Sequence, residues 1–492
     1  MNRIIITLII LALSGPLQLA AKDYNASLFG IKSNGTTLNT TAIQKAIDYI
    51  HENGGGQLVF YVGRYLTGAI ELKSNVTIHL KEGAILVGST NIYDYNINSP
   101  YTALVFAEKA DSIAIMGKGV IDGQGREVAY NLIDQIHKGI IQDEMKLDRP
   151  GTRRPRGICF RECTNVMISG IMIKNTADWV QLYDQCRNLK IDGITVDSKA
   201  FWNNDGLDVV DCRDVKITNS FFDASDDAIC FKSHDATKMC ENVEVRNCVA
   251  RSSANGIKFG TLTSGGYRNF KIINNKVYDT FRSAITIATP DGGLVENIVV
   301  DSLYAYNTGN AIFLRIGARW NKGRRGSMNN ITIQNMYAEI PATKPDAGYE
   351  YEGPIEDLPR NISPASIVGL PGQDITGVTL RNIEIVYAEG GNPNYAYRGI
   401  KPADLDSIPE MAPSYPEFSQ FKELPAWGFY VRHAKDLTFE NVKLTVKSRD
   451  YRPAIVLDDV KGATFKGVKY NEPGAGKKQL HQYKSTGIVQ KK

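Results

Sequence analysis

The sequence predicts an all-β protein in which the chain winds into a parallel β-helix, closed at its N-terminal end by one α-helix. Three observations predict this fold. Short units of the form Asn-Val-x-Ile, each followed by a second β-rich run, recur along most of the chain. The units are rich in Val, Ile, Phe and Thr, and polar turns rather than helices separate them. One amphipathic helical segment precedes the first unit, where an open sheet edge would otherwise be exposed.

The repeat is clearest from Asn165 to Asn297, where successive units begin 23, 26, 28, 27 and 28 residues apart. A period of this size without interleaved helices indicates a solenoid, in which each coil pairs with its neighbours and buries an inward stripe. A β-propeller is the main alternative, but its blades would be longer and antiparallel, and regular tight-hairpin signals are not evident. The units begin at Asn75, Ser112, Asn165, Asn188, Asp214, Asn242, Asn269, Asn297, Asn330, Gly377, Asp436 and Gly462.

The N-terminus has the pattern of a signal peptide over residues 1–21. Arg3 precedes the apolar residues 4–13, and small residues follow at positions 20 and 21. This pattern predicts cleavage before Lys22 and a secreted or periplasmic protein. A membrane anchor is the alternative, but the apolar run is short for a membrane span. No cysteine follows the run, so a lipoprotein anchor is not expected.

The capping helix is expected over about residues 41–53. Residues 41–44 have the pattern of a capping box, and apolar residues follow at helical spacing until Gly54. Such a helix must lay its apolar stripe against another part of the protein. We expect it to cover the first coil.

The mature chain is expected to form one domain over residues 22–472, followed by a polar tail over 473–492. The period breaks over residues 341–364 and 389–425, which are rich in Pro, Gly and Tyr and are expected to be long loops on one face. The formal net charge is only +4, which gives no reason to expect a nucleic-acid partner but permits an acidic polymer.

Four of the seven cysteines stand two residues before a unit start: Cys163, Cys186, Cys212 and Cys240. Stacked coils lie about 4.8 Å apart, so these side chains should form a column. A ladder of small buried thiols is favoured over disulfides along the column. A metal site is not expected, because a straight column gives no tetrahedral cage.

A second column carries the candidate chemistry. The residues directly before the second β segment of five consecutive coils are Asp205, Asp227, Asn255, Ser283 and Asn310. Stacking would place the backbones of Asp205 and Asp227 about 5 Å apart. Asp226 can share their site only if the chain turns or bulges there, because neighbours in a regular strand face opposite ways.

Three clustered carboxylates can cleave a glycosidic bond. Crowding raises the pKa of one carboxyl group, which stays protonated and can give its proton to the leaving oxygen. The other two remain charged and can orient and deprotonate a water molecule. The alternative is that these aspartates only cap turns, which is the weaker interpretation for three carboxylates in register on adjacent coils.

Residues 203–233 resemble glycoside hydrolase family 28, the polygalacturonases and their relatives. That family carries an Asn-Thr-Asp-Gly motif followed by an Asp-Asp pair, and this chain has NNDG at 203–206 and DD at 226–227. The stretches GTTLNTTAIQKAIDYI, YLTGAIELKSNVTIHLKEGAILVGS, KGVIDGQG and RPRGICF and the pair Asp178-Trp179 also resemble the family, so the likeness covers most of the mature chain. The resemblance implies a right-handed parallel β-helix and inverting hydrolysis without a metal or other cofactor.

The same resemblance implies residue roles by motif position. Asp226 would be the general acid, and Asp205 and Asp227 would hold and activate the water. Asn203 matches the first residue of the family motif, where we expect it to contact substrate, and Asn204 replaces the family's Thr.

Two substrate-contacting motifs of the family are missing. Where the family has Gly-His-Gly, this chain has ANG at 254–256, and where it has Arg-Ile-Lys, which contacts a galacturonate carboxylate, this chain has TIA at 286–288. Asn255 therefore takes the place of the family histidine. The identity of the cleaved sugar is left open by these departures.

Other cations lie near the same columns. Lys258, Arg282 and Arg315 are candidates for a substitute positive charge that binds an acidic sugar, although each is as readily a surface or turn residue. His234 is a candidate replacement for the missing histidine, with a loop histidine as the simpler interpretation.

The sequence thus predicts an exported inverting glycoside hydrolase that acts, as a monomer, on pectin or a related acidic polysaccharide. Exo-action on oligogalacturonides or rhamnogalacturonan is a further hypothesis. A polysaccharide lyase on the same fold and a non-catalytic carbohydrate-binding β-helix are the alternatives. Retention of all three carboxylates argues against a binding module, because binding alone needs no such cluster.

Overall fold

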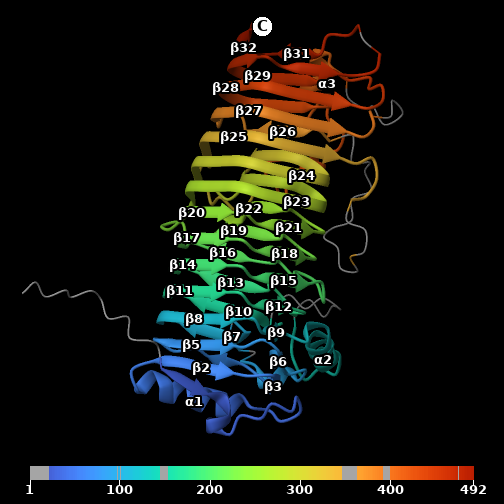
Figure 1. Ribbon diagram of the computed structural model, residues 1–492. Helices are drawn as coiled ribbons and strands as arrows, with labels where there is room; N and C mark the ends of the chain where they lie inside the picture. The colour runs from blue at the N-terminus through green and yellow to red at the C-terminus, as the bar shows by residue number, and fades with distance from the viewer. Residues whose placement is uncertain are drawn as a thin grey trace, which may run out of the picture.

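The computed structural model describes residues 22–96, 98–99, 101–143, 153–345, 349, 363–391, 399–474 and 476–491. Within them the chain winds into a right-handed parallel β-helix whose coils follow one another in chain order, from the helix α1 at one end to the C-terminus at the other (Figure 1). The predicted fold class is confirmed. The predicted signal peptide lies outside the described residues.

Three parallel sheets run along the column. The first sheet contains β1 (Asp23–Asn25), β2 (Gly56–Phe60), β5 (Val76–Leu80), β8 (Asp111–Gly117), β11 (Thr164–Ser169), β14 (Arg187–Asp192), β17 (Arg213–Thr218), β20 (Cys240–Arg246) and β32 (Thr486–Lys491). The second contains β3 (Gly63–Thr67), β6 (Ala84–Gly88), β9 (Val120–Asp122), β12 (Met172–Lys174), β15 (Thr195–Ser198), β18 (Phe221–Ala224), β21 (Val249–Ser252) and β30 (Lys469–Asn471). The third contains β4 (Ile70–Glu71), β7 (Ala103–Glu108), β10 (Arg156–Arg161), β13 (Gln181–Asp184), β16 (Asp208–Val210), β19 (Ile229–Ser233), β22 (Ile257–Thr263), β26 (Ala365–Val368) and β31 (Leu480–Tyr483).

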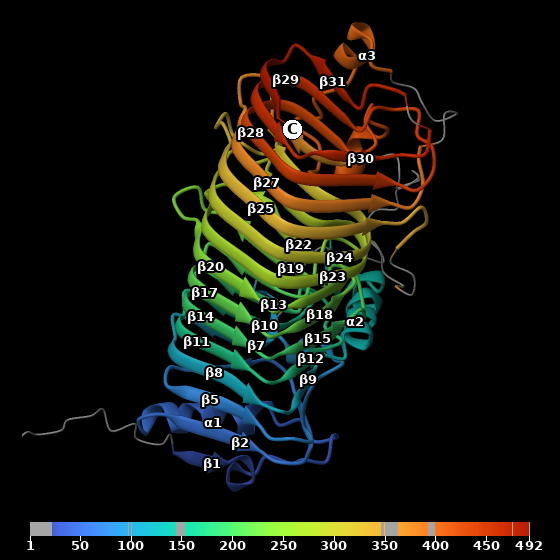
Figure 2. The same ribbon diagram turned by 45° about the horizontal axis from the view of Figure 1, so that its top comes forward.

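In the later coils one long strand bends from sheet to sheet. These strands are β23 (Gly266–Thr289), β24 (Leu294–Ile316), β25 (Ser327–Ile340), β27 (Ile375–Tyr387), β28 (Phe429–Val446) and β29 (Ile455–Lys466). Figure 2 shows the same stack with its C-terminal end tilted toward the viewer and the strands of successive coils lying over one another. The inward-facing Val, Ile, Leu and Phe side chains form one continuous buried core.

The unit starts of the repeat are corners of the coil. Each of the twelve has a positive φ, from 53° at Asn188 to 84° at Gly462. Asn, Asp and Gly tolerate this left-handed conformation better than other residues, which explains why they recur at the spacing of one coil. Their side chains also form a ladder: Asn242 donates to Asp214 at 3.0 Å, and Asn269 donates to Asn242 at 3.1 Å.

The capping helix is confirmed as α1 (Thr40–Glu52), which buries Ile43, Ala46, Ile47 and Ile50 over the first coil. The predicted capping box is not formed. The Gln44 amide instead accepts from the Glu71 N–H at 2.8 Å and donates to the Glu71 carbonyl at 3.0 Å. This side chain therefore satisfies the backbone of β4 rather than that of its own helix. The short 3₁₀ helix η1 (Ala26–Phe29) precedes α1.

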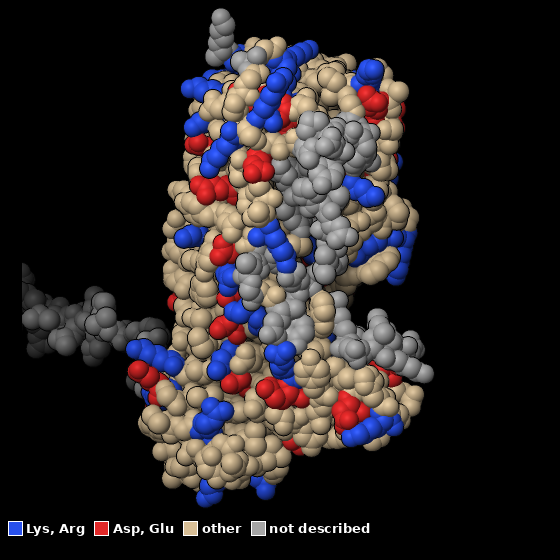
Figure 3. All heavy atoms as spheres, turned by 90° about the vertical axis from the view of Figure 1, so that its right-hand side faces the viewer, with Lys and Arg blue, Asp and Glu red and all other residues tan. Residues whose placement is uncertain are grey.

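A second helix, α2 (Gly125–His137), was not predicted. It leaves the coil after β9 and lies against the outside of the column, next to the 3₁₀ helix η2 (Ile92–Asp94) (Figures 1 and 2). Its Tyr130 ring packs edge-on against Phe201 at 6.0 Å, so it supports the loop that leads into Asn203. On the face that carries α2, Lys and Arg side chains lie among Asp and Glu side chains (Figure 3).

The C-terminal segment corrects one prediction. Residues 473–492 were predicted to be a polar tail, but β31 and β32 pair with β29 and form the last coil over the described part of that range. Leu480 belongs to the core, and Ile488 packs against it. The many lysines of this segment make these apolar positions hard to recognise in the sequence.

The excursion over residues 399–425 covers the third sheet. It contains α3 (Pro402–Asp406) and η5 (Phe418–Phe421), and its Leu405, Phe418 and Phe421 pack against Phe313 and neighbouring side chains of the sheet in a second buried cluster. This segment lies within the range 389–425 over which the sequence predicts a long loop on one face. Most of the loop predicted over 341–364 lies outside the described residues.

The cysteine column is confirmed. All seven cysteines are free and buried, and the Cys186 N–H donates to the Cys212 sulfur at 3.2 Å in the next coil. Among the described residues, no helix has both the length and the apolar character needed to cross a bilayer.

Candidate active site

The predicted polar column exists and lies at the bends that lead into the third sheet. The Gly206 N–H donates to the Asp227 carbonyl at 2.9 Å, and the Ala228 N–H donates to the Asn255 carbonyl at 2.9 Å. These bonds stack Asp205, Asp227 and Asn255 on successive coils. Continuation of the sheet hydrogen bonding around the bend places their side chains in register.

Asn204 fixes the first bend. Its side chain is fully buried; the amide oxygen accepts from the Ser198 hydroxyl and from the Ala200 N–H, and the amide nitrogen donates to two carbonyls of the preceding coil. Asn203 beside it is held in the left-handed region at a φ of 59° and accepts from Arg154 at 2.9 Å. Asn203 is half-buried and held by Arg154, and Asn204 is a structural anchor.

Asp226 joins the other two carboxylates because the chain bends between β18 and β19, as predicted. Its carboxylate accepts from the Asp227 N–H at 2.9 Å, and its own N–H donates to the Asn204 carbonyl at 3.3 Å. Asp226 is half-buried, whereas Asp205 and Asp227 expose only 4% and 3% of their surface. Of the three acids, Asp226 is thus the most accessible to a substrate.

On one side of the cluster, Lys232 binds two carboxylates from the preceding coil. Its ammonium lies 3.0 Å from Asp205 Oδ2, contacts Asp208 Oδ1, and lies 4.2 Å from the centre of the Trp179 ring. Burial raises the pKa of Asp205 and raises that of Asp208 to about 6, although Lys232 opposes both shifts. Asp208 was missed from the sequence, where it is only the third residue of a strand-like run.

On the other side, Asp227 is held as an anion. It accepts from the Asn255 side-chain amide at 2.8 Å, and Lys258 lies 2.9 Å from its second oxygen. Burial alone would raise the pKa of Asp227, but Lys258, Arg282, Lys232 and the Asn255 hydrogen bond together lower it.

The pKa of the neighbouring Asp226 moves the opposite way. Burial and then the Asp227 carboxylate raise it, while Arg282, Lys258 and Lys232 act in the other direction. Two adjacent carboxyl groups are thereby pushed apart in pKa, the condition under which one serves as an acid and the other stays charged.

Two of the predicted cations, Lys258 and Arg282, lie at this cluster, and the excursion supplies their partners. Glu417 Oε1 lies 3.0 Å from Arg282 and 3.3 Å from Lys258, and the Tyr415 hydroxyl lies 2.7 Å from Lys258. Glu417 and Tyr415 were missed, because the sequence offers no signal that this loop returns to the coils that carry the candidate aspartates.

Arg315 and His234 do not join the cluster. Arg315 donates to the carbonyls of Gly369 and Glu410 and packs on Phe421, so the prediction that it supplies charge to the site is wrong. It holds the excursion in place instead.

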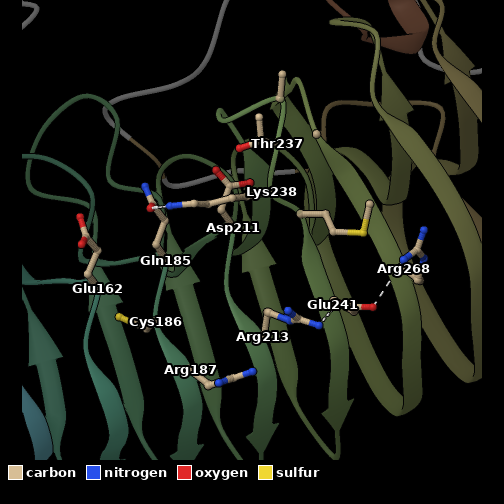
Figure 4. A pocket seen from close by; sticks show the side chains of 13 residues that line it. Glu162, Gln185, Cys186, Arg187, Asp211, Arg213, Thr237, Lys238, Glu241 and Arg268 are labelled. Carbon is tan, nitrogen blue, oxygen red and sulfur yellow. Dashed lines mark hydrogen bonds and ion pairs between the residues drawn. The ribbon is translucent and has the colours of Figure 1, made fainter. Parts of the chain in front are cut away.

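His234 lies at the opposite end of the third-sheet strands. Its Nε2 lies 3.0 Å from Asp184 and 3.5 Å from Asp211, so it does not replace the family histidine. Asp211 also lines a hollow of about 680 Å³ that contains the paired Arg213 and Glu241 (Figure 4). None of the three candidate catalytic aspartates lines that hollow.

Within the described part of the chain, two groups of side chains have ligand atoms close enough to share a metal ion: Asp184, Asp211 and His234, and Asp205, Asp227 and Cys230. In the second group, the Lys232 and Lys258 ammoniums already lie against the two carboxylates. These lysines supply the positive charge that an ion would bring.

A parallel β-helix with carboxylates clustered at the entry to one sheet has the groups that acid–base cleavage of a glycosidic bond needs. Residues 58–293 match the family described as "Glycosyl hydrolases family 28". The chain belongs to glycoside hydrolase family 28, and its enzyme class is glycoside hydrolase.

Two relatives are similar over long stretches. The chain is 27% identical to an exo-poly-α-D-galacturonosidase of Dickeya chrysanthemi in an alignment of 387 residues that covers 65% of this chain and 64% of that enzyme. It is 25% identical to a protein of Vitis vinifera described as "Probable polygalacturonase", over 82% of this chain and 84% of that protein. The alignment thus spans slightly less than two thirds of the Dickeya enzyme.

Solved structures share the fold. An exopolygalacturonase of Thermotoga maritima superposes with a TM-score of 0.59 at 23% identity, covering 75% of this chain and 87% of that one. A family 28 exopolygalacturonase of Yersinia enterocolitica superposes with a TM-score of 0.56 at 19% identity, covering 95% of this chain and 78% of that one.

Proposed function

We propose that this protein is an exported, inverting glycoside hydrolase that cleaves glycosidic bonds in pectin or a related acidic polysaccharide. The observation that carries the proposal is the opposed electrostatics of Asp226 and Asp227. One is half-buried with a raised pKa, and the other is buried, lysine-bound and held as an anion. A general acid must be protonated and a water-activating base must be charged, and these two carboxyl groups meet those requirements.

The proposed reaction is a single displacement. Protonated Asp226 gives its proton to the glycosidic oxygen as the bond to the anomeric carbon breaks. A water molecule held by Asp227 and Asp205 attacks that carbon from the opposite side and passes one proton to a carboxylate. Lys258 keeps Asp227 charged before the attack, and Lys232 opposes the rise in the pKa of Asp205. No metal or other cofactor takes part in this scheme.

The names of the relatives support an acidic substrate and exo-action. One relative is an exo-poly-α-D-galacturonosidase, and the Thermotoga and Yersinia proteins are exopolygalacturonases. The excursion over 399–425, which lies over the third sheet, favours short oligosaccharides over the interior of a long polymer. The signal-peptide pattern at residues 1–21 supports export.

The test is hydrolysis of polygalacturonate, rhamnogalacturonan and their oligosaccharides, followed by product mass and by NMR of the first anomer formed. We expect saturated products of inverted configuration, and an Asp226→Asn variant that is slower by about 10²- to 10⁴-fold. Asp214→Asn is the matched control, because Asp214 is a corner residue and neighbouring coils carry Asn at the same position. Unsaturated products that absorb in the ultraviolet, or full activity of Asp226→Asn, would contradict the proposal.

A further inference from the structure

The carboxylate of Glu417 is bound by side chains from distant coils, as the carboxylate of a bound ligand would be. It lies 162 residues from Asn255 along the chain, yet its Oε1 accepts from the Asn255 amide at 3.3 Å. The same oxygen lies 3.3 Å from Lys258 and 3.0 Å from Arg282. A loop residue thus receives an amide, an ammonium and a guanidinium from the catalytic coils.

All four of these side chains are buried. Asn255 and Lys258 have no exposed surface, and Arg282 and Glu417 each expose 2%. Charge-assisted bonds from Lys and Arg, together with an amide donor, are what a protein offers to a sugar carboxylate. Glu417 therefore fills, from within the chain, a site suited to a uronic acid.

The charges at this site are already balanced. Lys258 lies between Asp227 at 2.9 Å and Glu417 at 3.3 Å, and Arg282 forms its ion pair with Glu417. An incoming carboxylate would meet the Glu417 anion in a buried environment, where repulsion between like charges is strong. A neutral sugar would meet no such repulsion.

An aromatic ring, that of Tyr415, lies beside Lys258 and Arg282. The Tyr415 ring lies 4.7 Å from the Lys258 ammonium and 5.9 Å from the Arg282 guanidinium, and Tyr415 is 39% exposed. An exposed ring offers the apolar face of a sugar a surface to pack on, without requiring a charge on that sugar.

We propose that Glu417 is a specificity-determining residue: it occupies the carboxylate site formed by Asn255, Lys258 and Arg282, and so excludes a carboxylate from the sugar that packs beside it on Tyr415. The sugar bound there, next to the scissile bond, is neutral. The preferred substrate is accordingly a mixed glycan in which a uronic acid is linked to a neutral sugar, rather than a homopolymer of uronic acids. This inference rests on the proposed hydrolase function of the same site.

The first experiment measures binding without turnover. In the Asp226→Asn background, calorimetry gives the dissociation constants of two probes of equal length, an oligogalacturonate and an oligosaccharide that alternates galacturonate with rhamnose. The chain with Glu417 is expected to bind the alternating probe more tightly. Adding Glu417→Gln, which keeps the shape and an acceptor oxygen, is expected to tighten oligogalacturonate binding about tenfold and to change the alternating probe less than about threefold.

The matched control is Glu410→Gln. Glu410 lies in the same excursion and pairs with Arg432 and His433, away from Lys258 and Arg282. It should leave the ratio of the two dissociation constants unchanged. Equal weakening of both probes by Glu417→Gln, no change in their ratio, or no binding of either probe to any variant would overturn the inference.

A second experiment separates this inference from the proposed function. With Asp226 restored, kcat/KM is measured on both probes for the wild-type chain and for the Glu417→Gln variant, and the ratio should shift in the same direction. A shift in the binding ratio without any hydrolysis would refute the hydrolase function and keep the role of Glu417 in selecting the ligand. Hydrolysis with no change in the ratio between the two probes would support the hydrolase function and refute the role of Glu417 in selecting the ligand.

Discussion

The two sides of the carboxylate cluster are built in different ways. On one side, Lys232 binds Asp205 and Asp208, which lie 27 and 24 residues before it, one coil away. On the other side, Lys258 binds Asp227 from the preceding coil and Glu417, which lies 159 residues further along the chain. The first side is made by the repeat alone, and the second needs the excursion. The repeat thus supplies the groups proposed for the chemistry, and the excursion supplies those proposed to select the sugar.

The largest effect is expected on the side made by the repeat. Lys232→Met removes the ammonium that pairs with two buried carboxylates, which should cost about 3–5 kcal/mol of the free energy of unfolding. Lys232 opposes the rise in the pKa of Asp205, so its loss raises that pKa further. The acid limb of the pH–rate profile should then move to higher pH.

Urea denaturation and the pH dependence of kcat/KM check this prediction. Lys190→Met is the matched control, because Lys190 is an exposed residue of the first sheet and should change neither measurement by a detectable amount. An unchanged acid limb in Lys232→Met would show that Asp205 takes no part in the rate.

Lys258→Met should have a smaller effect, about 2–3 kcal/mol, because Asn255 still donates to Asp227 and Arg282 still pairs with Glu417. Lys258 is the first of the charges that lower the pKa of Asp227, so that pKa rises when Lys258 is removed. The acid limb should again move to higher pH. The same urea and kcat/KM measurements apply, and equal losses of stability in the Lys232 and Lys258 variants would contradict the difference between the two sides.

Glu417→Gln should change the pH profile of kcat/KM and cost about 2 kcal/mol of the free energy of unfolding, because glutamine keeps an acceptor for Arg282 and Lys258 but leaves their buried charges without this anion. Without the Glu417 anion, more of the Arg282 and Lys258 charge acts on Asp226, and both lower the pKa of that group. If protonated Asp226 is the acid, the alkaline limb should move to lower pH. A shift of the limb to higher pH would refute this account.

The smallest effect is expected at His234, outside the cluster. The hydrogen bond to Asp184 raises the pKa of His234 above its ordinary value, although burial acts against it. A raised folded-state pKa gives stability that is fully present below the unfolded pKa of about 6.5 and is lost as the pH rises through the folded value. His234→Ala should therefore cost less than about 1 kcal/mol at pH 5, since the side chain is 37% exposed, and nothing well above pH 8.

Thermal unfolding at several pH values measures that difference, and kcat/KM should stay at the wild-type value. A loss of activity in His234→Ala that exceeds the loss at Lys232 would place the histidine in the catalytic machinery. The region around His234 would then have to be added to the comparison of the Lys232 and Lys258 sides.

The sequence predicts the repeat-built parts of the protein well, for a physical reason. Each coil buries one inward stripe and turns at one left-handed corner, so Asn188, Asp214 and Asn242 mark coils that stack in register. Register then places Asp205 beside Asp227 with no further information. The bend at Asp226 also follows, because two adjacent residues cannot otherwise share one site.

The parts that depend on long-range packing could not be predicted. Glu417 reaches Lys258 only because Phe418 and Phe421 pack over the third sheet, and no local pattern specifies that return. The error at Arg315 has the same origin, since its partners Gly369 and Glu410 lie in segments without the repeat. The helix α2 was missed because it interrupts the repeat between β9 and β10.

The ladder of corner amides has a direction. Asn188 donates to Asn165, Asn269 to Asn242 and Asn297 to Asn269, so each donor lies later in the chain than its acceptor. During synthesis from the N-terminus, a newly emerged coil therefore meets an acceptor that is already in place, and its own amide oxygen becomes the acceptor for the coil that follows. Coils can therefore be added to the column in the order in which the chain emerges. Each corner hydrogen bond forms only when its coil pairs in the correct register.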